Sequence, residues 1–470
     1  MTFTLITLLN SESLGWVMVR RKEPVLLTWR DVAALIDATL LAEKIKPSQQ
    51  AKRDAFKKHG IQGSVKDPPL TAIFYRIMKR LGIIDKVIRD LTGVKSVLLL
   101  DPHLRAALRV FVELKVFSRD GVRYDKYLEV KNRVASYLSK RSHPYVGMWF
   151  WDVVEELNDY ELKPSNKDEE LMIKYLVPPW YIRRMRDLIG DEVEELLKAL
   201  NTKPLISVRV NTLKATVSEV VEELSRRCRG VEVSKVVPTV IKFKGPYNFD
   251  KSRLFREGKI IIQEEAAALA SIILSPKPGE TVVDLCAAPG GKTQHMAELM
   301  RNKGVIYAFD IDKVRMRRLK ELMRRTGIDI VETYLRDGRE APRVLGEGIA
   351  DKVLVDAPCS ADGTLMKNPD LRWRLMESEV RKLAQLQYEL LKAALKLVKK
   401  GGRILYTTCS LLREEDEDVI MKLLRKEGNR IRVINILGPY DKGFIDGVMR
   451  AWPHKHGTIG FFYALLEKVR

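Results

Sequence analysis

The stretch VVDLCAAPGGKT at residues 282–293 decides the fold, because an apolar run passes there directly into a glycine-rich turn. The run VVDL is typical of a buried strand, and the residues from Gly291 onward are typical of a helix. Glycines let the backbone approach a ligand closely, and a helix N-terminus presents unpaired N–H groups to an anion. The stretch therefore indicates a nucleotide-like ligand at the carboxyl end of a sheet.

Two familiar phosphate-binding turns do not fit this stretch. A Walker A loop needs a glycine five positions before Gly291, where Cys286 stands instead, and the pattern GxGxxG is absent. The remaining fit is the methionine carboxylate or ribose of S-adenosyl-L-methionine, with an ordinary strand–turn–helix connection as the alternative. We interpret Cys286 as a small packing residue rather than a nucleophile.

From residue 260 onward, strand and helix patterns alternate. The strand candidates are TVVDL, GVIYAFD, DIVETY, DKVLVD and GRILYTT, and the longest helix runs from Ser378 to about Lys400. Such alternation is typical of a parallel, doubly wound sheet. The sequence therefore predicts an α/β, Rossmann-like domain over residues 260–470.

Two aspartates follow successive strands of this predicted sheet. Asp310 ends the second strand, where a carboxylate can accept both hydroxyl hydrogens of a ribose. Asp337 follows the third strand and is placed to face an adenine amino group. Either aspartate alone would be read as a cap or turn residue. Their joint placement favours the cofactor.

The residues before the α/β domain predict two further domains. Residues 1–165 show helical periodicity and few strand signals, which predicts an all-helical domain. The polar stretch LKPSNKDEE (162–170) indicates a boundary. Residues 166–259 then combine a strand-like stretch, LISVRVNTL, with a helical one, VSEVVEELSRR, which predicts a small α+β unit.

The composition limits which classes of binding partner and which cellular compartment we expect. Lys and Arg number 83 against 62 acidic residues, a net charge of +21, which favours nucleic acid over a membrane surface. Four cysteines without a CxxC pair argue against a disulfide framework and a structural zinc site, so we expect no metal and a cytoplasmic location. No run reaches the roughly 20 apolar residues of a membrane span. The first 18 residues lack the pattern of a signal peptide, and we expect them to be frayed or docked on the core.

Two cysteines stand where two further predicted strands end. Cys359 comes just after the apolar run in LVDAPCS, and Cys409 comes just after the one in LYTTCS. Carbon 5 of cytosine is a poor nucleophile until a thiolate adds at carbon 6. The chemistry therefore needs a cysteine with a lowered pKa and groups that polarise the ring and move protons. Asp356 is placed to contact the ring nitrogen or the cofactor. Two such cysteines predict covalent methylation of a base.

These motifs together resemble the Sun/Fmu (RsmB-like, NSUN-type) RNA cytosine-5 methyltransferases. The matching stretches are DLCAAPGGKT, DAPCSADGTLMKNPDLRW and YTTCSLLREEDEDVI, and with their flanking motifs they cover roughly Leu171 to the C-terminus. RVNTLK (209–214) is similar to the family's RRM-like segment. LLLDPHLRAALRVFVEL (98–114) is similar to the NusB-like RNA-binding domain fused to some members. The resemblance also implies an archaeal thermophile as the source.

The resemblance implies a role for each motif residue. Cys409 would be the nucleophile and Cys359 would assist resolution of the adduct, an order that spacing alone leaves open. Asp356 would act in catalysis and at the cofactor. S-adenosyl-L-methionine would be the cofactor. Its site would comprise Cys286, Ala287, Ala288, Pro289, Gly290, Gly291, Lys292, Asp310, Asp337 and Asp356.

The implied partner is structured RNA, in which one cytidine becomes 5-methylcytidine. Ribosomal RNA is favoured by the RsmB-like N-terminus, with tRNA as the main alternative, and a monomer is compatible with the sequence. A non-catalytic ribosome-assembly factor would not need both thiols. A DNA methyltransferase would need a target-recognition insert, and the sequence has no long insertion between the motifs.

Overall fold

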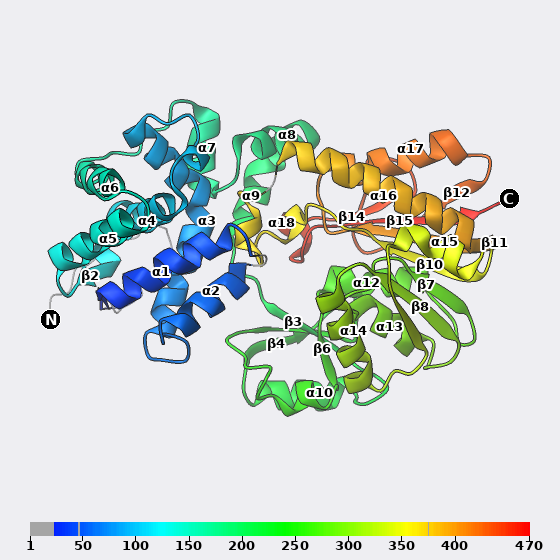
Figure 1. Ribbon diagram of the computed structural model, residues 1–470. Helices are drawn as coiled ribbons and strands as arrows, with labels where there is room; N and C mark the ends of the chain where they lie inside the picture. The colour runs from blue at the N-terminus through cyan, green and yellow to red at the C-terminus, as the bar shows by residue number, and fades with distance from the viewer. Residues whose placement is uncertain (1–22, 46–47, 375) are drawn as a thin grey trace, which may run out of the picture. The chain divides into compact units, whose positions relative to one another are not determined.

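The computed structural model describes residues 23–45, 48–374 and 376–470 (Figure 1). It divides into two compact units. The first holds the described residues up to Leu162 except residues 78–83, which group with everything from Lys163 onward in the second. The expectation for residues 1–18 lies outside the described residues. Within the described ranges, no helix is both long enough and apolar enough to cross a membrane.

The first unit is built mainly from helices, as its periodicity predicts. Asp101 caps one of them, accepting the backbone N–H groups of His103 and Leu104, with Pro102 in the first turn. The structure adds a short parallel strand pair that the all-helical prediction missed, because strands of three residues carry too little pattern to read. The elements are β1 (Val25–Leu27), α1 (Trp29–Ala42), α2 (Ser48–Lys58), α3 (Asp67–Thr92), α4 (Pro102–Val112), β2 (Val122–Tyr124), α5 (Tyr127–Arg141) and α6 (Pro144–Glu156).

The second unit opens with three helices and a four-stranded antiparallel sheet. The sheet order is β4-β5-β3-β6, and the chain runs β-α-β-β-α-β, which is the ferredoxin-like arrangement. Thr216 and Glu219 form a capping box that starts its longer helix. The elements are α7 (Lys167–Tyr175), α8 (Pro179–Ile189), α9 (Val193–Asn201), β3 (Ile206–Val210), α10 (Val217–Ser225), β4 (Arg229–Val233), β5 (Val240–Lys244), α11 (Arg253–Arg256) and β6 (Ile260–Ile262).

This small sheet extends past the predicted domain boundary at residue 259. β6 pairs with β3, so the sheet ends at Ile262. The three-domain division itself stays a prediction, since the chain separates into only two compact units.

The remainder of the chain forms the predicted α/β domain. Five strands run parallel in the order β9-β8-β7-β10-β11, with helices on both faces (Figure 1). One apolar core joins α12, α13 and α14 to one face of the sheet, and a second joins α16 and α17 to the other. The elements are α12 (Glu265–Leu274), β7 (Thr281–Asp284), α13 (Gly291–Leu299), β8 (Val305–Asp310), α14 (Lys313–Thr326), β9 (Val331–Leu335), α15 (Ala341–Leu345), β10 (Ala350–Asp356), α16 (Glu377–Leu397) and β11 (Val398–Thr408).

The C-terminal strands add antiparallel pairs to the parallel sheet that was predicted. β15 lies beside β11 and runs antiparallel to it, and β12 and β14 pair antiparallel with β15. This part of the chain lacks the strand–helix alternation that predicts parallel pairing, which explains the difference. The elements are α17 (Glu417–Glu427), β12 (Ile431–Ile434), β13 (Asp441–Lys442), β14 (Met449–Ala451), α18 (Pro453–His456) and β15 (Phe461–Lys468).

A buried arginine joins the small sheet to the α/β domain. Arg209 on β3 is fully buried and forms an ion pair with Glu298 of α13. Its Nε donates to Gln263 Oε1 at 2.7 Å, and it also donates to Gln294. Glu298 accepts the backbone N–H of Thr212 at 3.0 Å as well. Because a buried charge must be paired, these contacts fix the two sheets to each other.

Candidate active site

The predicted site residues meet where the strand order of the large sheet reverses. β7 pairs with β8 on one side and with β10 on the other. In open α/β sheets, ligands bind at such a reversal, beyond the carboxyl ends of the strands. The predicted cofactor turn follows β7, and Cys359 and Cys409 follow β10 and β11. The prediction that the two cysteines follow adjacent strands is confirmed, since β10 and β11 are neighbours.

The turn after β7 is fastened to the end of β8. The Ala287 N–H donates to the Phe309 carbonyl at 2.8 Å, and the Ala288 N–H donates to Asp310 Oδ2 at 3.1 Å. Gly290 adopts φ +106°, which side-chain-bearing residues rarely reach. The turn leads directly into α13, where the N–H groups of the first helical turn have no partner within the helix.

Of the two predicted cofactor aspartates, Asp310 contacts the turn and Asp337 pairs with Arg339, and the cofactor role of each stays a prediction. Asp310 is 5% exposed, and its second oxygen accepts the Asp312 N–H at 2.9 Å. Asp337 pairs with the Arg339 guanidinium at 2.7 Å, and this hydrogen bond holds the pKa of Asp337 below its usual range.

The turn fits S-adenosyl-L-methionine. A carboxylate has about four acceptor sites, so Asp310 retains capacity for the two ribose hydroxyls. The free N–H groups of α13 suit the carboxylate of the methionine part. Gly291 leaves room on this side, since a Cβ there would have no neighbour closer than 3.7 Å.

The sequence did not single out Asp284, which lies beneath the turn. It is almost wholly buried at the end of β7, and its Oδ2 accepts the Thr293 hydroxyl at 2.8 Å. Burial raises the pKa of Asp284 to about 7. Burial, and next the charge of Asp284, raise the pKa of the neighbouring Cys286 thiol well above its usual value, which keeps that sulfur protonated. Within VVDL, Asp284 could be read only as part of a strand.

The two thiols face each other directly. The Sγ atoms of Cys359 and Cys409 are 3.4 Å apart, and either sulfur can donate to the other. The contact with Cys409, followed by burial, raises the pKa of Cys359 well above the usual value. The raised pKa favours the thiol form of Cys359.

Asp356, at the end of β10, connects the thiols with the cofactor turn. Its Oδ2 accepts from Lys292 Nζ at 2.7 Å, and its Oδ1 accepts from the Thr407 hydroxyl at 3.0 Å. Lys292 also lies over the Phe461 ring, 5.1 Å from its centroid. The structure thus directs Lys292 to Asp356, so this lysine belongs to the catalytic edge as much as to the turn.

A buried carboxylate fastens the two cysteine loops together. Glu415 accepts the backbone N–H of Ser360 at 3.0 Å and the side-chain amide of Gln387 at 3.0 Å, and it also accepts the Ser360 hydroxyl. The hydroxyls of Ser360 and Ser410 are 3.2 Å apart. Burial raises the pKa of Glu415 to about 7. Each serine directly follows one of the two cysteines, so this network fixes the positions of both sulfurs relative to each other.

A second buried cluster supports the Cys409 loop from behind. Arg450 on β14 is fully buried and binds Glu417 through both guanidinium edges, with Nε–Oε1 at 2.8 Å. It also lies 2.9 Å from Asp416 and donates to the Leu411 carbonyl at 3.0 Å. Burial alone would raise the pKa of Glu417, but the guanidinium outweighs it and holds the pKa low. Burial keeps Asp416 protonated by raising its pKa well above the usual value.

Sequence reasoning missed both clusters for one reason. Glu415, Asp416 and Glu417 lie in the run REEDED, and a run of charges is ordinarily solvent-exposed. The available signal was its position directly after YTTCS. No group of three His, Cys, Asp or Glu side chains in the part of the chain that the structure describes is arranged to hold a metal ion.

Comparison with known proteins agrees with this geometry. Residues 271–467 match the family model described as 16S rRNA methyltransferase RsmB/F. Residues 177–250 match the ferredoxin-like domain of RsmF/B-like methyltransferases. The expectation of a small α+β unit is therefore confirmed, whereas the NusB-like character of the helical unit stays a prediction.

Individual relatives show the same relationship. The chain is 32% identical over 302 residues to the probable ribosomal RNA small subunit methyltransferase B of Bacillus subtilis, a match that covers 62% of this chain and 66% of that protein, just under two thirds of its length. The crystal structure of PH0851 is 53% identical and covers 95% of this chain and 100% of its own, with a TM-score of 0.84. The structure of NSun6 from Pyrococcus horikoshii with SFG is 25% identical and covers 62% of this chain and 98% of its own, with a TM-score of 0.58. The predicted family is thus confirmed: the chain belongs to the RsmB/F family of methyltransferases.

Proposed function

We propose that this chain transfers a methyl group from S-adenosyl-L-methionine to carbon 5 of a cytidine in structured RNA, with ribosomal RNA as the favoured substrate. The observation that carries the proposal is the pair of thiols 3.4 Å apart at the ends of adjacent strands. A methyltransferase acting on an exocyclic amine or a ribose hydroxyl has no use for two such sulfurs. Ribosomal RNA is favoured because the curated relative of Bacillus subtilis bears that name.

Cys409 is the nucleophile in this proposal. Its thiolate adds to carbon 6 of the target cytosine, and the ring electrons shift so that carbon 5 becomes nucleophilic. The cofactor supplies an electrophilic methyl group when bound. After methylation the proton at carbon 5 leaves to solvent, the carbon 6–sulfur bond breaks, and Cys409 departs with the electron pair.

Cys359 serves the second half of the reaction. Because its pKa is raised, it is a thiol when the adduct resolves, and its S–H can donate to the departing sulfur of Cys409. A hydrogen bond to the leaving thiolate favours cleavage of the carbon–sulfur bond. Loss of Cys359 should therefore trap the adduct rather than prevent its formation.

Asp356 and Lys292 act on the cytosine ring. A carboxylate beside the base can hold a protonated ring nitrogen, which draws electrons from carbon 6 and assists thiolate attack. The ion pair of 2.7 Å with Lys292 and the bond from Thr407 orient this carboxylate. The turn after β7 and Asp310 hold the cofactor beside them. The target base must leave its stack to reach this buried edge.

The test uses labelled S-adenosyl-L-methionine, total RNA from an archaeal thermophile and four forms of the protein. Wild type and Cys228→Ala, a cysteine of the small sheet domain, should transfer label to one RNA species, and bisulfite sequencing should find one protected cytidine. Cys409→Ala should lose turnover while keeping RNA affinity. Cys359→Ala should accumulate a covalent protein–RNA species on denaturing gels. Identical behaviour of the Cys359 and Cys409 variants would refute the assignment of roles.

A further inference from the structure

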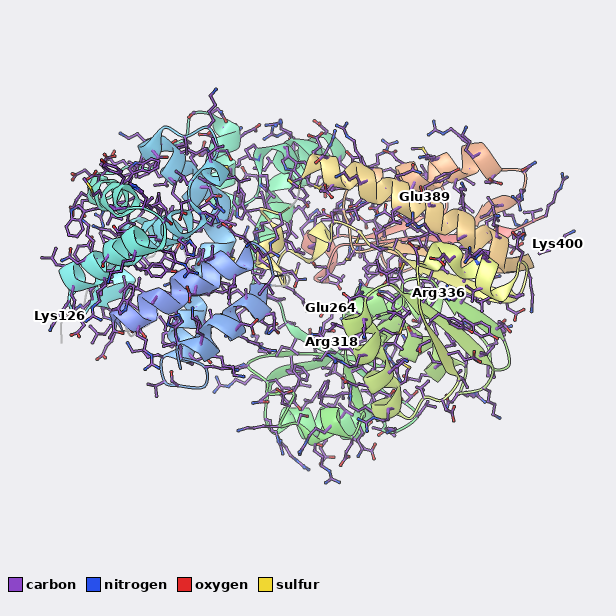
Figure 2. All side chains as sticks on the ribbon, in the orientation of Figure 1. Lys126, Glu264, Arg318, Arg336, Glu389 and Lys400 are labelled. Carbon is purple, nitrogen blue, oxygen red and sulfur yellow. The ribbon has the colours of Figure 1, made fainter. Side chains whose placement is uncertain are left out.

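Helix α14 carries a stripe of cations without a carboxylate within 4.0 Å among the residues that the structure describes. Lys313, Arg317, Lys320 and Arg324 are spaced i, i+4, i+7 and i+11, which places them within about 60° of arc along some 16 Å of helix. All four are exposed, whereas Met316, Leu319 and Met323 of the same helix are buried against the sheet. Figure 2 labels Arg318 on this helix, which adds a further exposed cation.

The cations of the stripe differ from those of α16, another exposed helix of the second unit, in their ion pairs. Within the described ranges, none of the stripe's four side chains has a carboxylate within 4.0 Å. On α16, by contrast, Arg381 pairs with Glu377 and Lys382 pairs with Glu379. Like charges three and four residues apart repel and weaken a helix. An uncompensated row of cations is therefore costly in the isolated protein and is relieved by a polyanion.

The position of α14 ties the stripe to the site. Lys313 begins the helix three residues after Asp310, at the cofactor edge of the sheet. At the other end, Arg325 donates to the Phe255 carbonyl of the small sheet domain, and Lys214 donates to the Arg325 carbonyl at 2.9 Å. The stripe thus runs from the reaction edge to the small sheet domain within one compact unit.

We propose that the Lys313–Arg324 stripe is a phosphate-binding surface that holds the RNA strand leading to the flipped cytidine. Neighbouring cations on one helix face lie about 5–6 Å apart, close to the spacing of successive phosphates in a single strand. Contacts of this kind position the nucleic acid without reading its sequence. This inference rests on the proposed function for its RNA substrate, but it concerns binding alone.

The test compares two variants with the same change in net charge. One carries Arg317→Gln, Lys320→Gln and Arg324→Gln. The control carries Arg381→Gln, Lys382→Gln and Lys396→Gln, three exposed cations of α16 that already have carboxylate partners. Affinity for a fluorescein-labelled single-stranded RNA of mixed sequence is measured by anisotropy from about 50 to 200 mM KCl.

The stripe variant should lower the slope of log affinity against log salt by about 2, since each lost contact to single-stranded RNA accounts for about 0.7. The control should change the slope by less than about 0.5. In the methylation assay the stripe variant should raise KM with little change in kcat. Equal slopes for the two variants would overturn the proposal. It would also be overturned if the stripe substitutions weakened binding to anionic lipid vesicles but left RNA affinity unchanged.

The two proposals fail in different ways. If no cytidine is methylated but the stripe variant still loses its salt dependence, the surface stands and the proposed reaction falls. If methylation is confirmed but the two variants have equal slopes of log affinity against log salt, only the proposed phosphate-binding surface is refuted.

Discussion

Replacing Arg450 by Met tests whether the buried cluster behind Cys409 is held together by one cation. The guanidinium is fully buried, contacts Glu417 and Asp416, and supplies a donor to the Leu411 carbonyl. Methionine fills much of the same volume but leaves the buried Glu417 carboxylate without a counter-charge. Removing one partner of a buried ion pair typically costs about 3–5 kcal/mol.

That loss should be plain in thermal unfolding. At about 1 °C for each kcal/mol in a protein of 470 residues, Arg450→Met should lower Tm by roughly 3–5 °C at pH 7. Arg432→Met is the matched control, because that side chain is 64% exposed and pairs with Glu467 on the surface. An exposed pair contributes about 0–1 kcal/mol, so the control should lose about 1 °C at most.

A second substitution distinguishes charge from packing. Adding Glu417→Gln to Arg450→Met removes the stranded carboxylate and should restore part of the lost Tm, since a neutral amide is cheaper to bury than a charge. The reasoning is refuted if Arg450→Met loses no more than the control. It is equally refuted if the double variant is less stable than the single one, because packing would then dominate.

Two further predictions concern the cofactor turn. A Cβ on Gly338 would lie 2.3 Å from the Leu285 carbonyl, so Gly338→Ala should displace the start of the turn and weaken S-adenosyl-L-methionine binding by about tenfold in calorimetry, whereas Gly121→Ala, with open space around it, should not. An unchanged affinity would show that the turn tolerates the shift. The pKa of Asp284 is raised to about 7, so its contribution to stability is complete below about pH 4 and is lost as pH rises through 7. Asp284→Asn removes that loss, so its free energy of unfolding relative to wild type should rise by roughly 3 kcal/mol between pH 5 and pH 8, and a pH-independent difference would contradict the raised pKa.

Local patterns carried the prediction of the α/β domain. The strand at 305–310 is an apolar run ending in Asp310, which marks it in the sequence itself. The antiparallel β15 could not be predicted, because the strand beside which it lies, β11, is distant in the chain. Pairing of that kind depends on the whole sheet rather than on any window of sequence.

The sequence allowed several residues of the site to be named, but not the contacts that these residues make. Cys359 and Cys409 could be placed at strand ends, yet their separation follows from the register of β10 on β11. Asp337 could be proposed for the cofactor, but its ion pair with Arg339, two residues later, could not. Glu415 gave no signal of burial beyond its position after YTTCS, because Ser360 and Gln387, which enclose it, lie far away in the chain.

The Arg209–Glu298 pair also predicts that the α/β domain loses stability when it is separated from the small sheet domain. A fragment begun at residue 260 would contain every motif of the α/β domain but would lack β3 and its arginine. Glu298 would then be left on α13, the helix that receives the cofactor turn, without its cation and without the Thr212 bond. The ferredoxin-like domain thus completes the contacts of a helix in the α/β domain, and a chimera of the two domains should keep both ends of the ion pair.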